Sequence, residues 1–234
     1  MQSHEKIISE TAKKFLAPEG FFQKASSRIW LDDRGYYIIL VEFQPSAFTK
    51  GTYLNVGVSF LFETNTAPDD TLAYDIGGRI SGFAEYRDDI TFQKEIERFA
   101  ALAMKQVRTY RKLDSLHYAQ KLLQKAARKK SKTAAGWDLY HLALVCFLQG
   151  SLDKGVKAMD AFLESIPFDS QIPWHTNIRN YCTQTLMPMC STWESAQDMV
   201  EDMINRRRTL FMSKASFKKM NGTYSVSSRK AAGC

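Results

Sequence analysis

The hydrophobic pattern of this 234-residue chain changes its period near Asp89, and that change constrains the possible folds more than any other feature. Residues 52–62 (TYLNVGVSFLF) alternate, so one face of an extended strand would carry Leu54, Val56, Val58, Phe60 and Phe62. After Asp89, apolar residues recur every three or four positions, at Phe92, Ile96, Phe99, Ala103, Val107 and Tyr110. This spacing is typical of a long helix that covers one face of a sheet. We therefore expect an α+β fold.

The first half of the chain is rich in aromatic and β-branched residues joined by short polar links, which predicts an antiparallel sheet. The expected strands are residues 28–31, 36–44, 52–62 and a weaker one at 72–83, where three glycines suggest a bend. An opening helix at residues 4–16 ends before Pro18 and Gly20, which cannot continue it. The N-terminal domain should therefore be an antiparallel sheet with flanking helices.

The second half of the chain is expected to be helical. The predicted helical regions are residues 115–130, 137–163, 174–186 and 192–212. The last of them would start at a capping box formed by Ser191 and Glu194. These patterns predict an α+β domain (residues 1–112), a helical domain (113–212) and a basic, flexible tail (213–234).

The region from Trp137 to Pro167 resembles a tetratricopeptide-type helical hairpin. Its matching positions are Leu139, Leu142, Ala143, Gly150, Gly155, Phe162 and Pro167, whereas Cys146 and Met159 replace larger rings. A single copy is recognisable, and such repeats need neighbours to bury their faces. The resemblance implies a hairpin that packs against the other predicted helices.

Residues 5–110 resemble a bacterial domain-of-unknown-function family with a Leu-x-Pro-x-Gly-Phe turn and an Asn-x-Gly-Val strand. The matching residues are Leu16, Pro18, Gly20, Phe21, Lys24, Trp30, Gln44, Ser46, Asn55, Val56, Gly57 and Val58. Because the family has no assigned reaction, the resemblance implies a fold and no activity.

The formal net charge of +7 comes from the end of the chain. Residues 205–234 hold eight of the 32 basic residues and no acid, which leaves 24 bases against 25 acids before them. Both this region and the basic run at residues 121–132 are candidates for binding phosphates or an acidic protein, although arginines near a helix end can also complement the helix dipole. The candidate residues are Lys121, Lys125, Arg128, Lys129, Lys130, Arg206, Arg207, Arg208, Lys214, Lys218 and Lys219.

Pairing of strands 36–44 and 52–62 would gather polar residues on one face of the sheet, namely Glu42, Gln44, Asn55 and Ser59. One interpretation is a shallow pocket for a peptide or nucleotide, which Gly57 would leave open. The other is that Gly57 and Ser59 make room for a helix while the amides hydrogen-bond to backbone. The second interpretation is favoured because pockets are few per protein.

Signatures of catalysis are not recognised in the sequence: it has no P-loop, dinucleotide-binding motif or nucleophile elbow. His175, Cys182 and Cys190 are spaced by seven and eight residues, which matches no zinc finger or ribbon. We therefore expect no metal and no cofactor. An enzyme with an unrecognised site on the sheet stays open as a third, weaker hypothesis.

Four residues of the first hairpin helix would line its groove: Trp137, Tyr140, Leu144 and Phe147. If exposed, they would form an apolar patch of the kind that binds a partner, and otherwise the N-terminal domain or a neighbouring helix covers them. The leading hypothesis is a non-catalytic adaptor subunit that binds another protein within a complex. The alternative is an accessory factor that binds DNA or RNA through residues 121–132 and 206–230.

The expected location is the bacterial cytoplasm. The sequence shows no apolar segment of the roughly 20 residues that span a bilayer and no secretory signal. Its four cysteines lack the spacing of a disulfide framework, and free thiols suit a reducing compartment.

Overall fold

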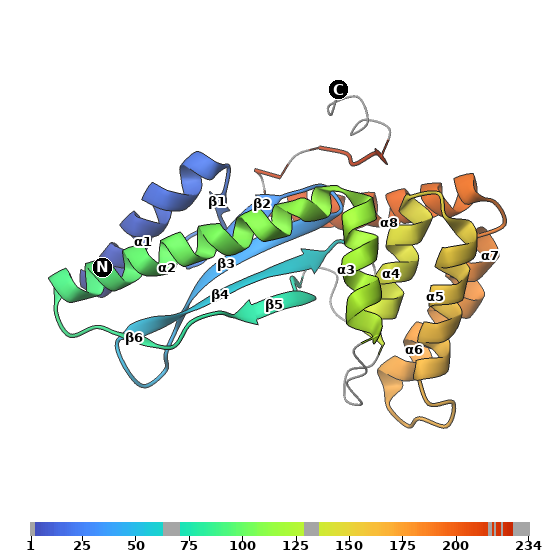
Figure 1. Ribbon diagram of the computed structural model, residues 1–234, viewed down its shortest axis with the longest axis horizontal. Coiled ribbons are helices and arrows are strands. Elements are labelled where there is room, and N and C mark those ends of the chain that lie inside the picture. The colour runs from blue at the N-terminus through green and yellow to red at the C-terminus, as the bar shows by residue number, and fades with distance from the viewer. Residues whose placement is uncertain are drawn as a thin grey trace. The chain divides into compact units, whose positions relative to one another are not determined.

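The computed structural model describes residues 3–62, 71–128, 136–214, 217, 219–220 and 222–226, and it has the predicted α+β fold (Figure 1). The chain forms two compact units. The first comprises Met1–Phe60, Leu72–Arg111 and Phe211–Asn221, and the second comprises Leu61–Thr71, Lys112–Leu210 and Gly222–Cys234. The segment predicted as a separate tail is thus divided between the two units.

A six-stranded antiparallel sheet forms the centre of the first unit. Its strands are β1 (Phe22–Gln23), β2 (Ile29–Asp33), β3 (Tyr37–Pro45), β4 (Gly51–Phe60), β5 (Ile76–Arg79) and β6 (Ala84–Glu85). The first five lie side by side in chain order, and β6 also pairs with β4. The predicted antiparallel sheet is confirmed, whereas the weak strand predicted at 72–83 is reduced to β5, and β6 follows just after that range.

Two helices pack together in the first unit, and the longer one runs along the sheet (Figure 1). These are α1 (Ser3–Leu16), followed by a 3₁₀ turn (Ala17–Glu19), and α2 (Asp89–Tyr110). α2 begins at Asp88, whose carboxylate accepts a hydrogen bond from the Thr91 amide at 2.8 Å. All six apolar residues of its predicted stripe are buried, so the prediction from the change in period is confirmed.

The second unit is helical. A 3₁₀ turn (Arg111–Asp114) leads from α2 to α3 (Leu116–Arg128), which is followed by α4 (Trp137–Leu148), α5 (Leu152–Ser165), α6 (Pro173–Asn180), α7 (Met187–Met189) and α8 (Trp193–Met212). α4 packs against both α3 and α5, and residues on all its sides are buried, as expected of a helix at the centre of a bundle.

The α4–α5 hairpin is held by close packing at small residues. A methyl group added to Gly155 would overlap the ring of Phe147 on the facing helix. Phe162 of α5 packs against Tyr140, with 5.3 Å between the ring centroids. A helical hairpin therefore forms where it was predicted, whereas its relation to tetratricopeptide repeats stays a prediction.

Two helix boundaries differ from prediction. Thr192, and not Ser191, caps α8, because its hydroxyl accepts a hydrogen bond from the Ser195 amide at 3.2 Å. The helix predicted at 174–186 is α-helical only to Asn180 and continues as a π-helix over Tyr181–Leu186. The proline ring of Pro188 would clash with the carbonyl four residues earlier in a regular α-helix, which explains why the helix changes its winding just before it.

Candidate functional site

The second unit contains an open cavity of about 390 Å³. Four parts of the chain form its wall: the start of α3, the turn after α4, the first turns of α8 and residues 222–226. The lining residues are Asp114, Leu116, Leu148, Gln149, Gly150, Trp193, Gln197, Tyr224 and Val226. A mostly apolar wall with one carboxylate and two side-chain amides is typical of a ligand or peptide pocket.

The turn after α4 forms the side of the cavity that faces Trp193. Gly150 has a φ of 75°, a left-handed conformation that glycine adopts without strain. The amides of Gly150 and Ser151 donate hydrogen bonds of 2.9 Å to Phe147 O and Cys146 O, which satisfies the last carbonyls of α4. A methyl group on Gly150 would lie 3.5 Å from the Trp193 ring. Since that distance is ordinary van der Waals contact, the turn requires glycine for its left-handed φ and not for space beside the indole.

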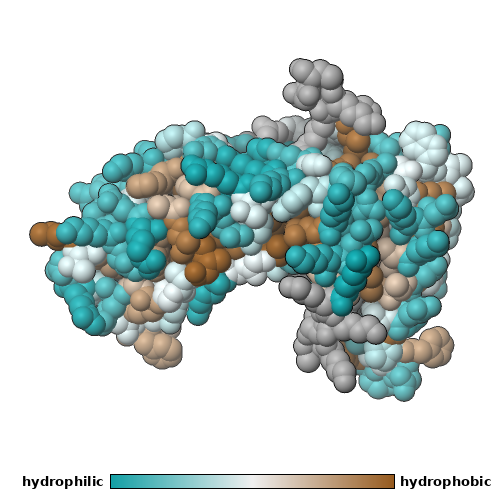
Figure 2. Space-filling view, viewed as in Figure 1, coloured by the Kyte–Doolittle hydropathy of each residue, from teal (hydrophilic) through white to brown (hydrophobic). Residues whose placement is uncertain are grey.

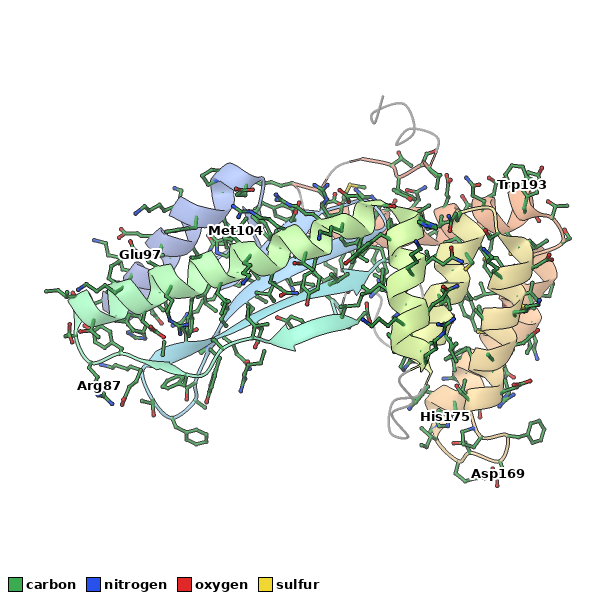
Figure 3. The ribbon with its side chains drawn as sticks, viewed as in Figure 1. Arg87, Glu97, Met104, Asp169, His175 and Trp193 are labelled. Atoms are coloured by element: carbon green, nitrogen blue, oxygen red, sulfur yellow. The ribbon has the colours of Figure 1, made fainter. Side chains whose placement is uncertain are left out.

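Trp193 is the exposed aromatic residue of the wall, with 51% of its surface accessible. It is the first residue of α8 and lies at the opposite end of the helical unit from His175 and Asp169 (Figure 3). Hydrophilic residues cover most of the visible face of this unit (Figure 2). A half-exposed indole beside an apolar cavity offers a surface that a partner side chain can cover.

The first half of α8 is acidic. Residues 193–205 contain Glu194, Asp198, Glu201 and Asp202 and neither lysine nor arginine, and Asp114 adds a carboxylate to the cavity wall. Acids near a helix N-terminus complement the helix dipole, which gives them a structural role as well. Their charge also favours a ligand with basic residues over an acidic one.

The segment predicted as a flexible tail contributes buried side chains in the part of it that the structure describes. Phe217, Met220, Tyr224 and Val226 are all buried. Phe217 packs on Phe211 with 4.7 Å between the ring centroids, and the ammonium of Lys24 lies 5.1 Å from its ring. The isolated apolar residues of this segment therefore pack against the rest of the protein. The sequence did not indicate this, because Ser, Lys and Gly dominate the composition of the segment.

The sheet brings together three of the four polar residues predicted to share a face. The side-chain amide of Asn55 donates to Glu42 at 2.8 Å and to Gln44 at 2.9 Å. Two further residues complete this network: the Tyr74 hydroxyl donates to Glu42 at 2.9 Å, and Arg79 donates to Gln44 at 2.8 Å. Burial and the Glu42 carboxylate raise the pKa of Tyr74, which keeps this hydroxyl a donor.

The fourth polar residue, Ser59, lies further along β4 and accepts a hydrogen bond from the Ala73 amide at 3.1 Å. A methyl group on Gly57 would overlap the Tyr74 ring and lie 2.6 Å from the Ile76 carbonyl oxygen. Gly57 thus admits β5 and Tyr74, and the prediction that it makes room for a helix is wrong. The amides of Asn55 and Gln44 bond to side chains, where bonds to backbone were expected.

The predicted partner patch on α4 is not exposed. Tyr140, Leu144 and Phe147 are fully buried, and Trp137 is partly buried. Trp137 stacks on Trp174 at 5.5 Å between ring centroids and also contacts Phe162. These four residues belong to the core of the helical unit, so the interpretation of them as a partner-binding surface is corrected.

The predicted basic residues differ in whether their side chains are bound within the chain or exposed. Arg207 donates to Phe62 O at 2.6 Å and to Thr71 O at 2.7 Å, and Arg208, 1% exposed, donates to Gly222 O at 3.0 Å. These two arginines hold the chain's own backbone, and Arg208 is not available to a phosphate. By contrast, six basic residues keep exposed or partly exposed side chains: Lys121, Lys125, Arg128, Arg206, Lys214 and Lys219. Lys129, Lys130 and Lys218 lie outside the described residues.

Sequence reasoning missed the cavity, because its wall joins residues more than 100 positions apart. Trp193 gave no local signal, because it lies three and seven positions before the buried Ala196 and Val200 and so has the spacing of the buried stripe. The C-terminal wall had no signal, since Tyr224 and Val226 belong to no helical pattern.

The fold and the cavity define an α+β protein with a helical unit that carries an open, mostly apolar pocket. No protein-family model, curated protein or solved structure matches the chain. The resemblance of residues 5–110 to a bacterial family therefore stays a prediction. None of the helices in the described part of the chain is long and apolar enough to cross a membrane.

Proposed function

We propose that this protein is a non-catalytic adaptor subunit of the bacterial cytoplasm, and that a partner protein binds it at the cavity beside Trp193. The observation that carries the proposal is a half-exposed indole at the mouth of a cavity of about 390 Å³. Tryptophan is the residue that most often dominates the energy of a protein interface. Free buried thiols at Cys146 and Cys182 support the cytoplasmic location, because such thiols persist in a reducing compartment.

The chemistry of the wall supports a peptide rather than a small metabolite. Gln149 and Gln197 provide amides that can bond to a peptide backbone, and Leu116 and Leu148 provide an apolar floor. The acids of the first half of α8, which adjoins the cavity, favour a basic residue next to the inserted side chain.

The test is affinity purification of the full-length protein from its native host, with nuclease treatment. We expect one protein partner with the wild type and at least a tenfold lower recovery with Trp193→Ala. Phe168→Ala is the matched control, because Phe168 is 92% exposed, belongs to the same unit and does not line the cavity. Equal recovery with both variants would refute a role for Trp193.

Binding of nucleic acid is the second candidate, and one observation favours it. Lys121, Lys125 and Arg128 are exposed and spaced by four and three residues, so they share one side of α3. The same purification separates the candidates, because nuclease would abolish an association that runs through DNA or RNA. Steep loss of affinity with salt would be its further signature.

A further inference from the structure

Helix α8 binds the backbone of residues 222–226 through a row of its own side chains. Asn205 makes two hydrogen bonds to Tyr224: its carbonyl oxygen accepts from the Tyr224 amide at 2.8 Å, and its amide donates to the Tyr224 carbonyl at 3.0 Å. On either side, Arg208 donates to Gly222 O at 3.0 Å and Glu201 accepts from the Val226 amide at 3.1 Å. The contacts are therefore made to main-chain groups and do not depend on the identity of the bound side chains.

The contacts run in opposite order along α8 and along the bound segment, so the segment lies antiparallel to the helix. The binding residues of α8 follow one another at steps of four and three, and the bound residues at steps of two. The segment is irregular between a bend at Gly222 and the helical Val226, and its backbone still meets the helix at every second residue.

The side chains of the bound segment point to a sequence preference. Tyr224 and Val226 are 5% and 8% exposed, and both line the cavity next to Trp193. The backbone groups of both residues bond to α8, which holds their side chains at the cavity. The segment thus shows how a peptide with an aromatic residue, followed two positions later by an aliphatic one, fits this surface.

We propose that α8 and the cavity form a peptide-binding groove for a partner, and that the partner's segment carries this aromatic-x-aliphatic pattern and replaces residues 222–226. The inference rests on the proposed function and adds the main-chain contacts and the sequence pattern of the ligand. The neighbouring Glu194 and Asp198 would favour basic residues beyond the aliphatic position.

The test uses the full-length chain and a dye-labelled peptide with the sequence of residues 219–228, followed by fluorescence anisotropy. We expect saturable binding to the Tyr224→Ala variant, whose own segment has lost its aromatic anchor. Wild type should bind at least tenfold more weakly, because its tethered segment competes at a high effective concentration. A peptide with alanine in place of its tyrosine is the matched control and should not bind.

The variant Tyr224→Ala/Asn205→Ala separates groove binding from non-specific attachment. It should lose the peptide, while circular dichroism confirms that it remains folded. Equal binding to this double variant, or no binding to Tyr224→Ala, would overturn the inference. The proposed function would survive that result if Trp193→Ala still lost the partner, so the two failures can be told apart.

Discussion

At the scale of single residues, two arginines that were candidates for ligand binding, together with a neighbouring asparagine, bind backbone groups of the same chain. Arg207, Arg208 and Asn205 lie within four positions of one another on α8, and each bonds to a peptide group at least 14 residues away. Buried peptide groups normally have such partners, because an unpaired one is costly. These contacts make α8 the element that holds the C-terminal segment.

Asn205→Ala should lower the free energy of unfolding by about 1–3 kcal/mol, because two peptide groups of Tyr224 lose their partner. Cleavage by chymotrypsin after Tyr224 should become faster as the segment detaches. Asn177→Ala, an exposed asparagine on α6, is the control and should change neither quantity. Unchanged cleavage in the Asn205 variant would mean that the segment is held by other contacts.

A buried and an exposed arginine should respond differently to substitution. Arg208→Ala should destabilise the protein by about 2–3 kcal/mol, since it removes a buried charged donor from Gly222 O. Arg128→Ala should change stability by no more than about 0.5 kcal/mol, because Arg128 is exposed on α3. Denaturant unfolding measures both. Similar effects at both positions would contradict the structural role assigned to Arg208.

Cysteine reactivity gives a test with a defined pH dependence. Burial raises the pKa of Cys190 to about 11 and that of Cys182 to about 12, so both thiols stay protonated at neutral pH. Because the thiolate is the reactive form, alkylation of the partly exposed Cys190 should rise about tenfold per pH unit between pH 7 and 9. Cys182 should stay unmodified until the protein unfolds. Mass spectrometry after iodoacetamide would show this, and a plateau for Cys190 below pH 9 would contradict the raised pKa.

Some of these residue contacts could be predicted and others could not. Glu42 and Asn55 lie opposite each other in the β3–β4 register, which alternation and a short connection already imply. Arg208 and Gly222 meet through a segment with no periodic pattern, so nothing in the sequence indicates their pairing. Prediction succeeded where regular structure relates sequence position to space.

At the scale of elements, the α4–α5 hairpin depends on one close contact. Gly155→Ala should destabilise the protein by about 1–2 kcal/mol, because the added methyl group overlaps the fully buried Phe147 ring and the gain in helix propensity offsets only part of that cost. Gly82→Ala is the control, since an added methyl group there meets nothing within 4 Å. Thermal unfolding compares them, and a more stable Gly155 variant would show that the helices can separate without cost.

Most elements could be predicted because their hydrophobic periods are clear, as in α2 and β4. The π-helix at Tyr181–Leu186 could not, because apolar spacing does not distinguish it from an α-helix and only Pro188 hinted at a change. The groove residues of α4 were proposed as a partner-binding surface, but they belong to the core. An isolated hairpin would expose them, but here α3, α5 and the ring of Trp174 cover α4.

At the scale of the whole molecule, the net charge of +7 is a poor guide to a partner. Arg207 and Arg208 are bound to backbone carbonyls, whereas the first half of α8, which adjoins the cavity, is acidic. The local charge of this helix therefore has the opposite sign to that of the chain as a whole. We propose a protein partner ahead of a nucleic acid because of this contrast.

The most direct test of partner binding beside Trp193 is site-specific photocrosslinking in living cells of the native host. A photoreactive amino acid would replace Trp193 in one version of the full-length protein and the exposed Phe168 in another. If a partner protein binds beside Trp193, we expect a crosslink to one protein from position 193 and none from position 168. The crosslinked partner peptide should carry an aromatic-x-aliphatic pattern. Crosslinks from position 193 only to nucleic acid, or equal crosslinks from both positions, would contradict partner binding beside Trp193.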